Sequence, residues 1–211
     1  MNWIIDQTGR RDQVKRVIFL DRDGVINEDR DDYVKSWSEV RFIKGVRPAL
    51  KKFYRAGIPV IVITNQAAVG RGIIDESDVR DIHTRMGQAV KKAGGAIFRF
   101  YYCPHHPDDH CRCRKPRSGL LKQAGRDLQL DLKGCLFVGD ALRDIQAGKR
   151  AGCRTLLVKT GQGEKTLQKI LTRQTRISPD WICDDLGAAA ELMLNFYQDD
   201  TARLRRSDVQ D

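Results

Sequence analysis

Short apolar runs alternate with amphipathic helical patterns along almost the whole chain. The runs have the length and the β-branched or aromatic content of buried strands, and they fall at 16–20, 58–63, 96–102, 135–138, 153–158 and, as a short edge strand, 181–183. Apolar residues at helical spacing predict helices at 45–56, 75–93, 120–130, 142–151, 164–171 and 186–197. Because strands alternate with helices, we expect an α/β fold with a parallel sheet covered on both faces.

The length of 211 residues suits one domain. No internal repeat, low-complexity stretch or linker divides the chain, so we expect a single domain over residues 1–211, with its core at about 15–197 and a frayed polar tail at 198–211. No apolar run is long enough to span a bilayer, and residues 1–14 lack the apolar block of a secretory signal. These features predict a cytoplasmic protein without a membrane partner, whose six cysteines are thiols or metal ligands.

The formal net charge is +10, which can indicate nucleic acid, a membrane surface or a small anionic substrate as partner. The basic residues are spread along the chain. The one dense patch, Arg203, Arg205 and Arg206, lies in a tail that also carries acidic residues. Dispersed charge is typical of a solvated surface, and the sequence contains no recognised nucleic-acid-binding motif, so nucleic acid is not the expected partner.

The first apolar run ends abruptly in two carboxylates, Asp21 and Asp23, followed by Gly24. In an open α/β sheet the carboxyl ends of the strands form the edge at which ligands bind. Aspartate is also common in turns and at helix caps, so this motif alone leaves a purely structural interpretation open.

Polar or charged residues follow the other predicted strands as well. Thr64 and Asn65 follow the second strand, Arg114 and Lys115 come after the third, and Asp140 and Asp144 after the fourth. In a parallel sheet all these positions lie along one edge. Acids gathered at one place repel one another and call for a divalent cation, and their hard oxygen ligands suit magnesium. With a phosphate-binding lysine and neutral donors, the set contains what phosphoryl transfer requires.

These residues, in this order, resemble the four motifs of the haloacid dehalogenase-like phosphatases. The matching positions are Asp21-Arg22-Asp23-Gly24-Val25, Thr64 after an apolar strand, Lys115-Pro116, and Gly139-Asp140 with Asp144. The matches cover most of the chain, and the ordered set is specific although each single motif is weak. The resemblance implies a Rossmann-like three-layer sandwich with a central parallel sheet.

The resemblance also implies a role for each motif residue. Asp21 would be the nucleophile that forms an aspartyl-phosphate, and Asp23 the general acid for the leaving group and then the base for water. Thr64 and Lys115 would hold the phosphoryl group. Magnesium would be bound by Asp21, Asp140 and the backbone carbonyl of Asp23, with Asp144 acting through a water molecule. To act as an acid Asp23 needs a raised pKa, which we expect from crowding by neighbouring acids.

A second signal is the segment Cys103-Pro-His-His-Pro-Asp-Asp-His-Cys-Arg-Cys113, with three cysteines and three histidines. Thiolate and imidazole at this density suit tetrahedral zinc, and free thiols in a loop are the alternative. The spacing resembles the zinc loop of the D-glycero-D-manno-heptose 1,7-bisphosphate 7-phosphatases and the related histidinol-phosphate phosphatases. That resemblance selects Cys103, His105, Cys111 and Cys113 as ligands and leaves His106 and His110 facing the substrate or exposed. Four protein ligands close the coordination sphere, so the zinc would be structural and would fix the loop that leads into Lys115.

The spacing between the motifs leaves no room for a separate cap domain, which fits the capless branch that these phosphatases represent. Residues 28–42, polar and irregular, are expected to form a flap. Substrate would then be selected by loop residues, namely Arg22, Asp29, Arg30, Asp31, Asp32, Asn65, Gln66, Ala67 and Arg114.

By this resemblance the chain is expected to be a magnesium-dependent phosphomonoesterase acting on a sugar phosphate. The expected reaction is hydrolysis of the 7-phosphate of D-glycero-D-manno-heptose 1,7-bisphosphate, in the synthesis of ADP- or GDP-heptose precursors and of lipopolysaccharide. Three alternatives remain open: a histidinol-phosphate phosphatase, a nucleic-acid 3′-phosphatase, and an inactive zinc-stabilised binding module. The resemblance also implies a monomer.

Overall fold

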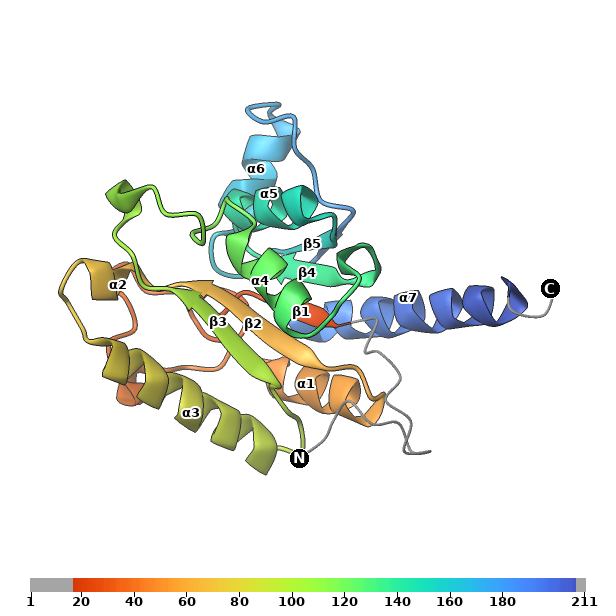
Figure 1. Ribbon diagram of the computed structural model, residues 1–211, viewed down its shortest axis with the longest axis horizontal. Coiled ribbons are helices and arrows are strands. Elements are labelled where there is room, and N and C mark those ends of the chain that lie inside the picture. Colours follow the sequence, from red (N-terminus) through yellow and green to blue (C-terminus); the bar gives the residue numbers. More distant parts are fainter. Residues whose placement is uncertain (1–16, 208–211) are drawn as a thin grey trace.

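The computed structural model describes residues 17–207, with side chains up to residue 197. It contains one sheet of six parallel strands in the order β3-β2-β1-β4-β5-β6 (Figure 1). The strands are β1 (Ile18–Leu20), β2 (Val60–Asn65), β3 (Arg99–Cys103), β4 (Leu136–Gly139), β5 (Arg154–Val158) and β6 (Trp181–Cys183). The α/β fold with a central parallel sheet is therefore confirmed, and each predicted strand forms within three residues of its expected start.

Helices connect the strands. They are α1 (Val46–Arg55), α2 (Ala67–Gly70), α3 (Glu76–Lys92), α4 (Gly119–Asp127), α5 (Leu142–Ala151), α6 (Gly163–Leu171) and α7 (Leu186–Ser207), with short 3₁₀ turns at Trp37–Glu39, Pro107–Asp109 and Leu132–Gly134. Two features differ from the sequence prediction. The short helix α2 was not expected, and α7 continues to Ser207, through most of the segment for which a frayed tail was predicted.

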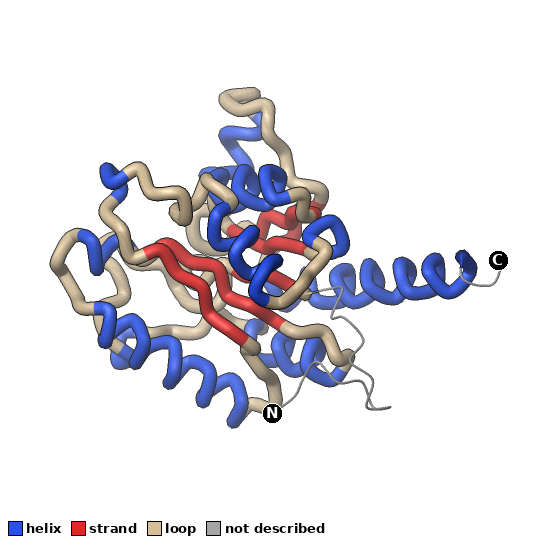
Figure 2. Tube along the Cα trace, in the orientation of Figure 1, coloured by secondary structure: helices blue, strands red, loops and turns tan. Residues whose placement is uncertain are grey.

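The sheet lies between two layers of helices (Figures 1 and 2). Alternate strand residues such as Ile18 and Leu20 join one apolar cluster with residues of α1, α3 and α7. Phe19 and Ile61 point the opposite way and pack with residues of α4 and α5. Burial on both faces explains why the strands read as continuous apolar runs rather than as alternating patterns.

The side chain of Tyr197, on α7, secures the amino ends of two central strands. Its hydroxyl donates to the carbonyl oxygen of Val17 at 2.7 Å and accepts from the backbone N–H of Leu136 at 3.1 Å. Both backbone groups lie at the end of the sheet opposite the predicted site. The last helix is thus joined to β1 and β4 by buried hydrogen bonds as well as by apolar packing.

The strand order reverses direction next to β1. The chain moves from β1 outward to β2 and β3, and then crosses back to β4 on the other side of β1. Ligands bind outside the carboxyl ends of strands at such a switch point. Residues 17–207 form a single sheet with its covering helices and loops, and no further sheet in that range forms a cap over this edge.

Within the same range, no helix combines the length and the apolar character needed to cross a membrane.

Candidate active site

Three carboxylates converge at the switch point. Asp21 directly follows β1, Asp140 follows β4, and Asp144 lies in the first turn of α5; one oxygen of each lies within 4.8 Å of the others. All three side chains are buried. Asp144 is held by the backbone N–H of Ala141, which donates to its Oδ2 at 3.0 Å, so the start of α5 fixes its direction.

The ammonium of Lys115 lies among these acids. Its Nζ is 2.8 Å from Asp21 Oδ1 and 2.8 Å from Asp144 Oδ1, and it donates to the carbonyl oxygen of Ile63 at 2.9 Å. These three acceptors match the three donors of an ammonium group. Lys115 is buried, so its charge is compensated by the two carboxylates rather than by water.

The acids are not fully compensated by this single lysine. Burial raises the pKa of Asp21 to about 6, although the charge of Lys115 opposes the shift. Burial, followed by the charges of Asp144 and Asp21, raises the pKa of Asp140 to about 8. Excess negative charge in a buried place favours a cation.

The local geometry fits magnesium. Asp140 Oδ1 is buried and has no hydrogen-bond partner among the residues that the structure describes. The other oxygen, Oδ2, accepts from the backbone N–H of Gln162 at 2.7 Å and lies against Gly24, where an added Cβ would be 2.1 Å away. Three clustered carboxylates, one of them with an unpartnered oxygen, offer the oxygen ligands that a hard divalent ion prefers.

Asp23 differs from the expectation of a raised pKa. Burial alone would raise the pKa of this carboxyl, but the charge of Arg22 and hydrogen bonds from Asn27, Arg22 and Gln66 lower it below its usual value. Arg22 donates through Nε and Nη2 at 2.9–3.0 Å, and Asn27 Nδ2 donates to Oδ1 at 2.9 Å. The structure therefore presents Asp23 as a carboxylate held by donors, not as an acid crowded by other acids.

Thr64 lies at the carboxyl end of β2, and Gln66 directly follows the strand, on the same edge of the sheet. The buried hydroxyl of Thr64 accepts from Gln66 Nε2 at 2.8 Å, and the same amide donates to Asp23 Oδ2 at 3.0 Å. Gln66 thus bridges two predicted catalytic residues. Because its oxygen already accepts, the hydroxyl hydrogen of Thr64 can be donated to a ligand.

Arg22, one of the predicted substrate-binding residues, has a buried side chain. It was expected to contact substrate, but its side chain is 1% exposed and faces Asp23 and His83. The prediction rested on the position of Arg22 between Asp21 and Asp23, at the carboxyl end of the first strand. The structure instead directs its side chain inward, towards α3.

Asn65 and Ala67 are two further predicted substrate-binding residues, and the structure shows what surrounds their side chains. The amide of Asn65 pairs with the backbone of Lys115 in both directions: Nδ2 donates to the Lys115 carbonyl at 3.1 Å, and Oδ1 accepts from the Lys115 N–H at 3.0 Å. Ala67 is buried at the start of α2. Asn65 therefore positions the lysine, and Ala67 contributes packing.

The flap residues have mixed surroundings. Arg30 pairs with Asp32 at 3.0 Å on the exposed surface. Asp29 accepts from the side chain of Gln162 at 3.2 Å. Asp29 and Asp31 border a surface hollow of about 460 Å³ whose other lining residues are Glu28, Ile43, Thr160, Gly161 and Gln162. This hollow adjoins the three clustered acids, because the backbone N–H of Gln162 donates to Asp140.

Two site residues were missed by the sequence reasoning. Arg143 lies beside the acids, and although burial would lower its pKa, the charges of Asp144, Asp21 and Asp140 raise it. Gln162 connects the loop after β5 to Asp140 and Asp29. Arg143 could have been predicted, because it directly precedes the motif residue Asp144 in the sequence. The contact from Gln162 is made by its backbone N–H, and no sequence pattern indicates it.

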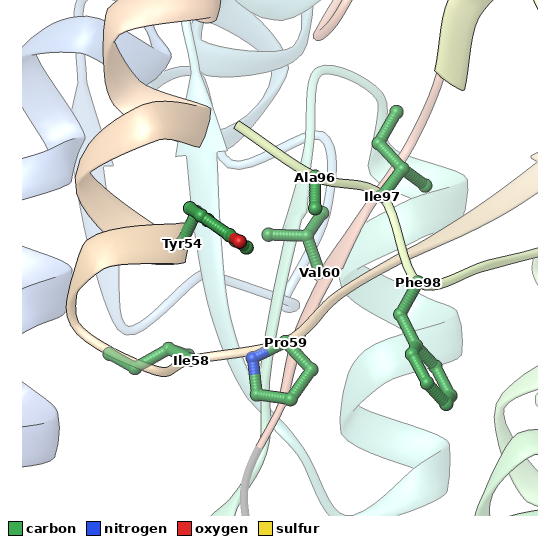
Figure 3. A pocket seen from close by; sticks show the side chains of 7 residues that line it. All are labelled: Tyr54, Ile58, Pro59, Val60, Ala96, Ile97 and Phe98. Atoms are coloured by element: carbon green, nitrogen blue, oxygen red, sulfur yellow. The ribbon is translucent and has the colours of Figure 1, made fainter. Parts of the chain in front are cut away.

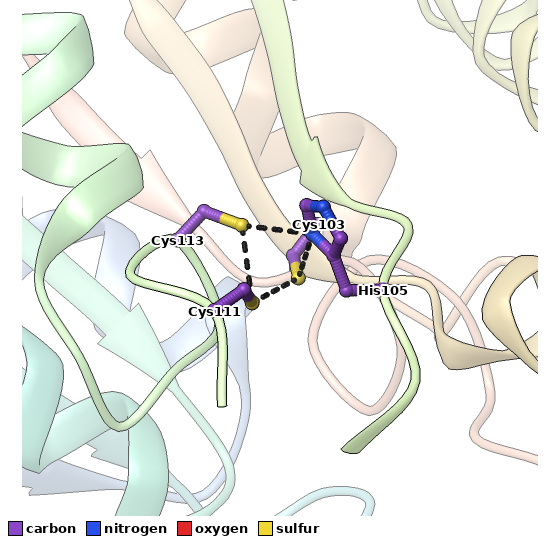
Figure 4. Close-up of side chains that lie close together, drawn as sticks. All are labelled: Cys103, His105, Cys111 and Cys113. Carbon is purple, nitrogen blue, oxygen red and sulfur yellow. Dashed lines mark hydrogen bonds between the residues drawn. The ribbon is translucent and has the colours of Figure 1, made fainter. Parts of the chain in front are cut away.

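The cysteine- and histidine-rich loop forms a compact cluster (Figure 4). Cys113 Sγ lies 3.2 Å from His105 Nδ1 and 3.3 Å from Cys111 Sγ, and Cys103 Sγ lies 3.5 Å from both Cys111 Sγ and His105 Nδ1. The cluster has the donor set of a closed tetrahedral zinc site.

His106 and His110 stand outside this cluster. The ring of His106 accepts from the backbone N–H of Asp108 at 3.3 Å and caps the short 3₁₀ turn, and His110 is exposed with a φ of 49°. The structure thus groups the four candidate ligands of this loop and leaves its other two histidines outside the group.

The loop also packs against the elements that carry the site. An added Cβ on Gly70, the last residue of α2, would lie 2.1 Å from the backbone nitrogen of His106, so only glycine allows this close approach. The guanidinium of Arg117 donates to the Cys111 carbonyl at 2.7 Å. The cluster is therefore connected on one side to the chain after β2 and on the other to the segment containing Lys115.

A separate apolar cavity of about 240 Å³ lies away from these groups (Figure 3). It is lined by Tyr54, Ile58, Pro59, Val60, Ala96, Ile97 and Phe98, at the amino ends of β2 and β3. The carboxylates lie at the opposite end of the strands. The cavity therefore takes no part in the candidate site.

A protein-family model described as HAD-hydrolase-like matches residues 112–189, the part that contains Lys115, Asp140 and Asp144. Two D-glycero-beta-D-manno-heptose-1,7-bisphosphate 7-phosphatases, from Bordetella bronchiseptica and Pseudomonas aeruginosa, are each 42% identical over 180 residues, covering 85% of this chain and 98% of the relative. The chain belongs to this phosphatase family. Its membership in the wider haloacid dehalogenase-like group follows from the same matches.

Solved structures of the family agree with the fold. The crystal structure of the D,D-heptose 1,7-bisphosphate phosphatase from B. bronchiseptica, complexed with magnesium and phosphate, matches with a TM-score of 0.79 and 41% identity, covering 86% of this chain and 98% of that one. The Burkholderia thailandensis phosphatase matches with a TM-score of 0.65 and 32% identity, covering 85% and 99%. The family match therefore extends over nearly the full length of both relatives.

Proposed function

We propose that the protein hydrolyses the 7-phosphate of D-glycero-D-manno-heptose 1,7-bisphosphate in the synthesis of nucleotide-activated heptose for lipopolysaccharide. The substrate assignment is supported by the names of relatives about 40% identical over most of the chain. The observation that carries the chemistry is the convergence of Asp21, Lys115 and Asp140 at the switch point of the sheet. A buried carboxylate beside a compensating lysine is a competent nucleophile towards phosphorus.

Asp21, Asp140 and the backbone carbonyl of Asp23 would hold magnesium, with Asp144 acting through water. The clustering of the acids, the raised pKa of Asp140 and its unpartnered oxygen support this assignment. When bound, the ion would supply neutralisation of the negative charge on the phosphoryl oxygens. A magnesium complex of the B. bronchiseptica relative gives independent support.

In the first step an oxygen of Asp21 attacks phosphorus, and the bond from phosphorus to the sugar oxygen breaks. Asp23 gives its proton to that leaving oxygen, so that an alcohol and not an alkoxide departs. Because Asp23 is held as a carboxylate by its donors, it must gain this proton when substrate is present. The charge of a nearby phosphate dianion raises the pKa of a carboxyl group and favours that change.

In the second step water attacks the phosphorus of the aspartyl-phosphate. Asp23, now a carboxylate, accepts a proton from the water, and inorganic phosphate leaves with Asp21 restored. Thr64 and Lys115 hold the phosphoryl oxygens throughout, the first through its hydroxyl and the second through its ammonium. Their burial next to Asp21 supports these roles.

Arg114 and the hollow beside the flap are the proposed contacts of the sugar and its second phosphate. Arg114 Nη1 is buried and, within the described part of the chain, donates to no acceptor. An arginine donor in that state is suited to bind a phosphate or a sugar hydroxyl. Of the flap residues, Asp29 and Asp31 border the hollow and are better placed for this than the paired Arg30 and Asp32.

Cys103, His105, Cys111 and Cys113 would hold a structural zinc ion. The zinc would stabilise the loop that leads into Arg114 and Lys115, with no part in the chemical steps.

We further propose that the enzyme acts as a monomer in the cytoplasm. All six cysteines lie in the described residues and none is in a disulfide, which suits such a reducing compartment.

One panel of substrates tests the proposed function. Phosphate release is measured with magnesium from heptose bisphosphate, histidinol phosphate and an oligonucleotide with a 3′-phosphate. We expect heptose bisphosphate to give the highest kcat/KM. Preferential release from either of the others would replace the substrate assignment, and no release from any would favour a binding module.

A substitution tests the assigned nucleophile. We expect Asp21→Asn to fold normally, as judged by circular dichroism and thermal unfolding, and to have no measurable turnover. The amide cannot attack phosphorus as a carboxylate does, while its shape is nearly the same. Turnover comparable to that of the unmodified enzyme would exclude Asp21 as nucleophile.

A further inference from the structure

His83, on α3, is the second partner of the buried Arg22. The imidazole Nε2 lies 3.4 Å from Arg22 Nη1. The guanidinium has only donors, so Nε2 must be the acceptor and His83 must carry its hydrogen on Nδ1. Burial, together with the charge of Arg22, lowers the pKa of His83 to about 3, which agrees with a neutral acceptor.

The imidazole is fixed by aromatic neighbours from β3. It stacks on Phe100 with ring centroids 4.4 Å apart and an angle of 12° between the planes, and its edge meets Tyr102 at 5.6 Å. His83 is 6% exposed. The ring is therefore held in one orientation by an element outside the motif loops.

This orientation determines which edge of the guanidinium faces Asp23. Nη1 is directed to His83, which leaves Nε and Nη2 to donate to both oxygens of Asp23 at 2.9–3.0 Å. A two-pronged contact of this kind restricts the direction of a carboxylate more strongly than a single bond does. Asp23 receives further bonds from Asn27 and Gln66, but among its donors in the described residues only Arg22 contacts both of its oxygens.

We propose that His83 is a positioning residue for the phosphoryl-transfer reaction, acting through Arg22 to aim the carboxyl group of Asp23. The inference rests on the proposed function, because it assumes that Asp23 protonates the leaving group. It extends the site by one residue on α3 that contacts neither substrate nor metal. Loss of the acceptor on His83 frees the guanidinium to turn, and Asp23 then loses its defined direction.

The leaving group provides the test. A sugar alkoxide needs a proton from Asp23, whereas nitrophenolate is stable enough to leave without one. The ratio kcat/KM reports the steps up to formation of the aspartyl-phosphate and excludes its hydrolysis. His83→Phe keeps the stack on Phe100 and removes the acceptor, and His83→Gln restores an acceptor oxygen.

We expect His83→Phe to lower kcat/KM for the sugar phosphate by about 10-fold or more, which is part of the roughly 100- to 10,000-fold that general acid catalysis contributes. The kcat/KM for p-nitrophenyl phosphate should stay within about threefold, and His83→Gln should recover most of the loss with the sugar phosphate. Met86→Leu, a nearby buried change on α3, serves as the packing control and should affect neither substrate.

Equal losses with both substrates would show a structural role and overturn the proposal, as would unchanged activity with the sugar phosphate. A double-mutant cycle gives a second criterion with the sugar phosphate alone. In an Asp23→Asn background, His83→Phe should have no additional effect. If unmodified enzyme releases phosphate from neither substrate, the proposed function itself fails, and that result is distinct from either outcome for His83.

Discussion

The side-chain amide of Asn65 is paired with the backbone of Lys115 through two hydrogen bonds, one in each direction, at 3.1 and 3.0 Å. Asn65 is the last residue of β2, and Lys115 lies in the segment that follows the cysteine-rich loop. The contact joins these two parts of the chain at the point where the ammonium reaches Asp21. The position of the lysine is therefore set by a strand end rather than by a cap domain.

We expect Asn65→Ala to reduce kcat by roughly 10- to 100-fold, because a displacement of about 1 Å in a catalytic group can cost a factor of that size. Steady-state kinetics with the sugar phosphate measure the effect. Thr172→Ala is the control, since it also removes a bond from a side chain to a backbone carbonyl, at the end of α6. An unchanged kcat in Asn65→Ala would show that Lys115 is positioned without this contact.

The fold was predictable because buried parallel strands appear as continuous apolar runs and the connecting helices have their own period. The end of α7 was not predictable by the same reasoning, since the polar residues after 197 lack an apolar stripe. The helix α2 is only four residues long and packs by way of Gly70 on the backbone of His106. Such a contact comes from tertiary structure and leaves no periodic pattern.

The site was predictable at the level of position and less so at the level of side-chain direction. Strand ends placed Asp21, Lys115 and Asp140 at one edge, and the structure brings their charged groups together. Arg22 and Asn65 lie at the same edge, but one is buried against α3 and the other pairs with backbone. Residue type and position along the strand do not determine which neighbours a long polar side chain reaches.

Removal of the proposed zinc ion should reduce activity without affecting magnesium binding. We expect Cys113→Ser to lose bound zinc, measured by atomic absorption, and to lower kcat by about 10-fold or more as Lys115 loses its support. The magnesium concentration for half-maximal activity should stay the same, because the acids lie on β1, β4 and α5.

Cys183→Ser is the matched control for the zinc experiment, since this half-buried thiol lies in β6, outside the cluster. It should keep both zinc and activity. Full activity in zinc-free Cys113→Ser would contradict a role for the ion in supporting Lys115. A changed magnesium requirement would show that the two sites are coupled.

His83 should make the protein less stable as the pH falls. Its pKa is about 3 in the folded state, against an ordinary value of 6.5, so below pH 6.5 the unfolded chain binds a proton that the folded chain does not. The resulting loss in the free energy of unfolding is about 2 kcal/mol between pH 7 and pH 5. Urea unfolding at the two pH values measures it.

His83→Phe should remove this particular loss, because phenylalanine does not bind a proton. From pH 7 to pH 5 the unmodified protein should therefore lose about 2 kcal/mol more of its free energy of unfolding than the variant does. His110→Asn is the comparison, because His110 is exposed and asparagine tolerates its φ of 49°. A difference for His83→Phe that is constant with pH would mean that His83 titrates normally.

The hydroxyl of Tyr197 should contribute to stability but not to catalysis. Tyr197→Phe leaves the buried carbonyl of Val17 without this donor and the N–H of Leu136 without this acceptor, at the end of the sheet remote from Asp21. We expect the free energy of unfolding to fall by about 1–3 kcal/mol, the usual cost of unpaired buried polar groups, with kcat unchanged. Tyr102→Phe removes a hydroxyl bonded at 2.9 Å to the exposed Glu76 and should cost less than about 0.5 kcal/mol. Equal costs for the two variants would show that α7 is held to the sheet by apolar packing alone.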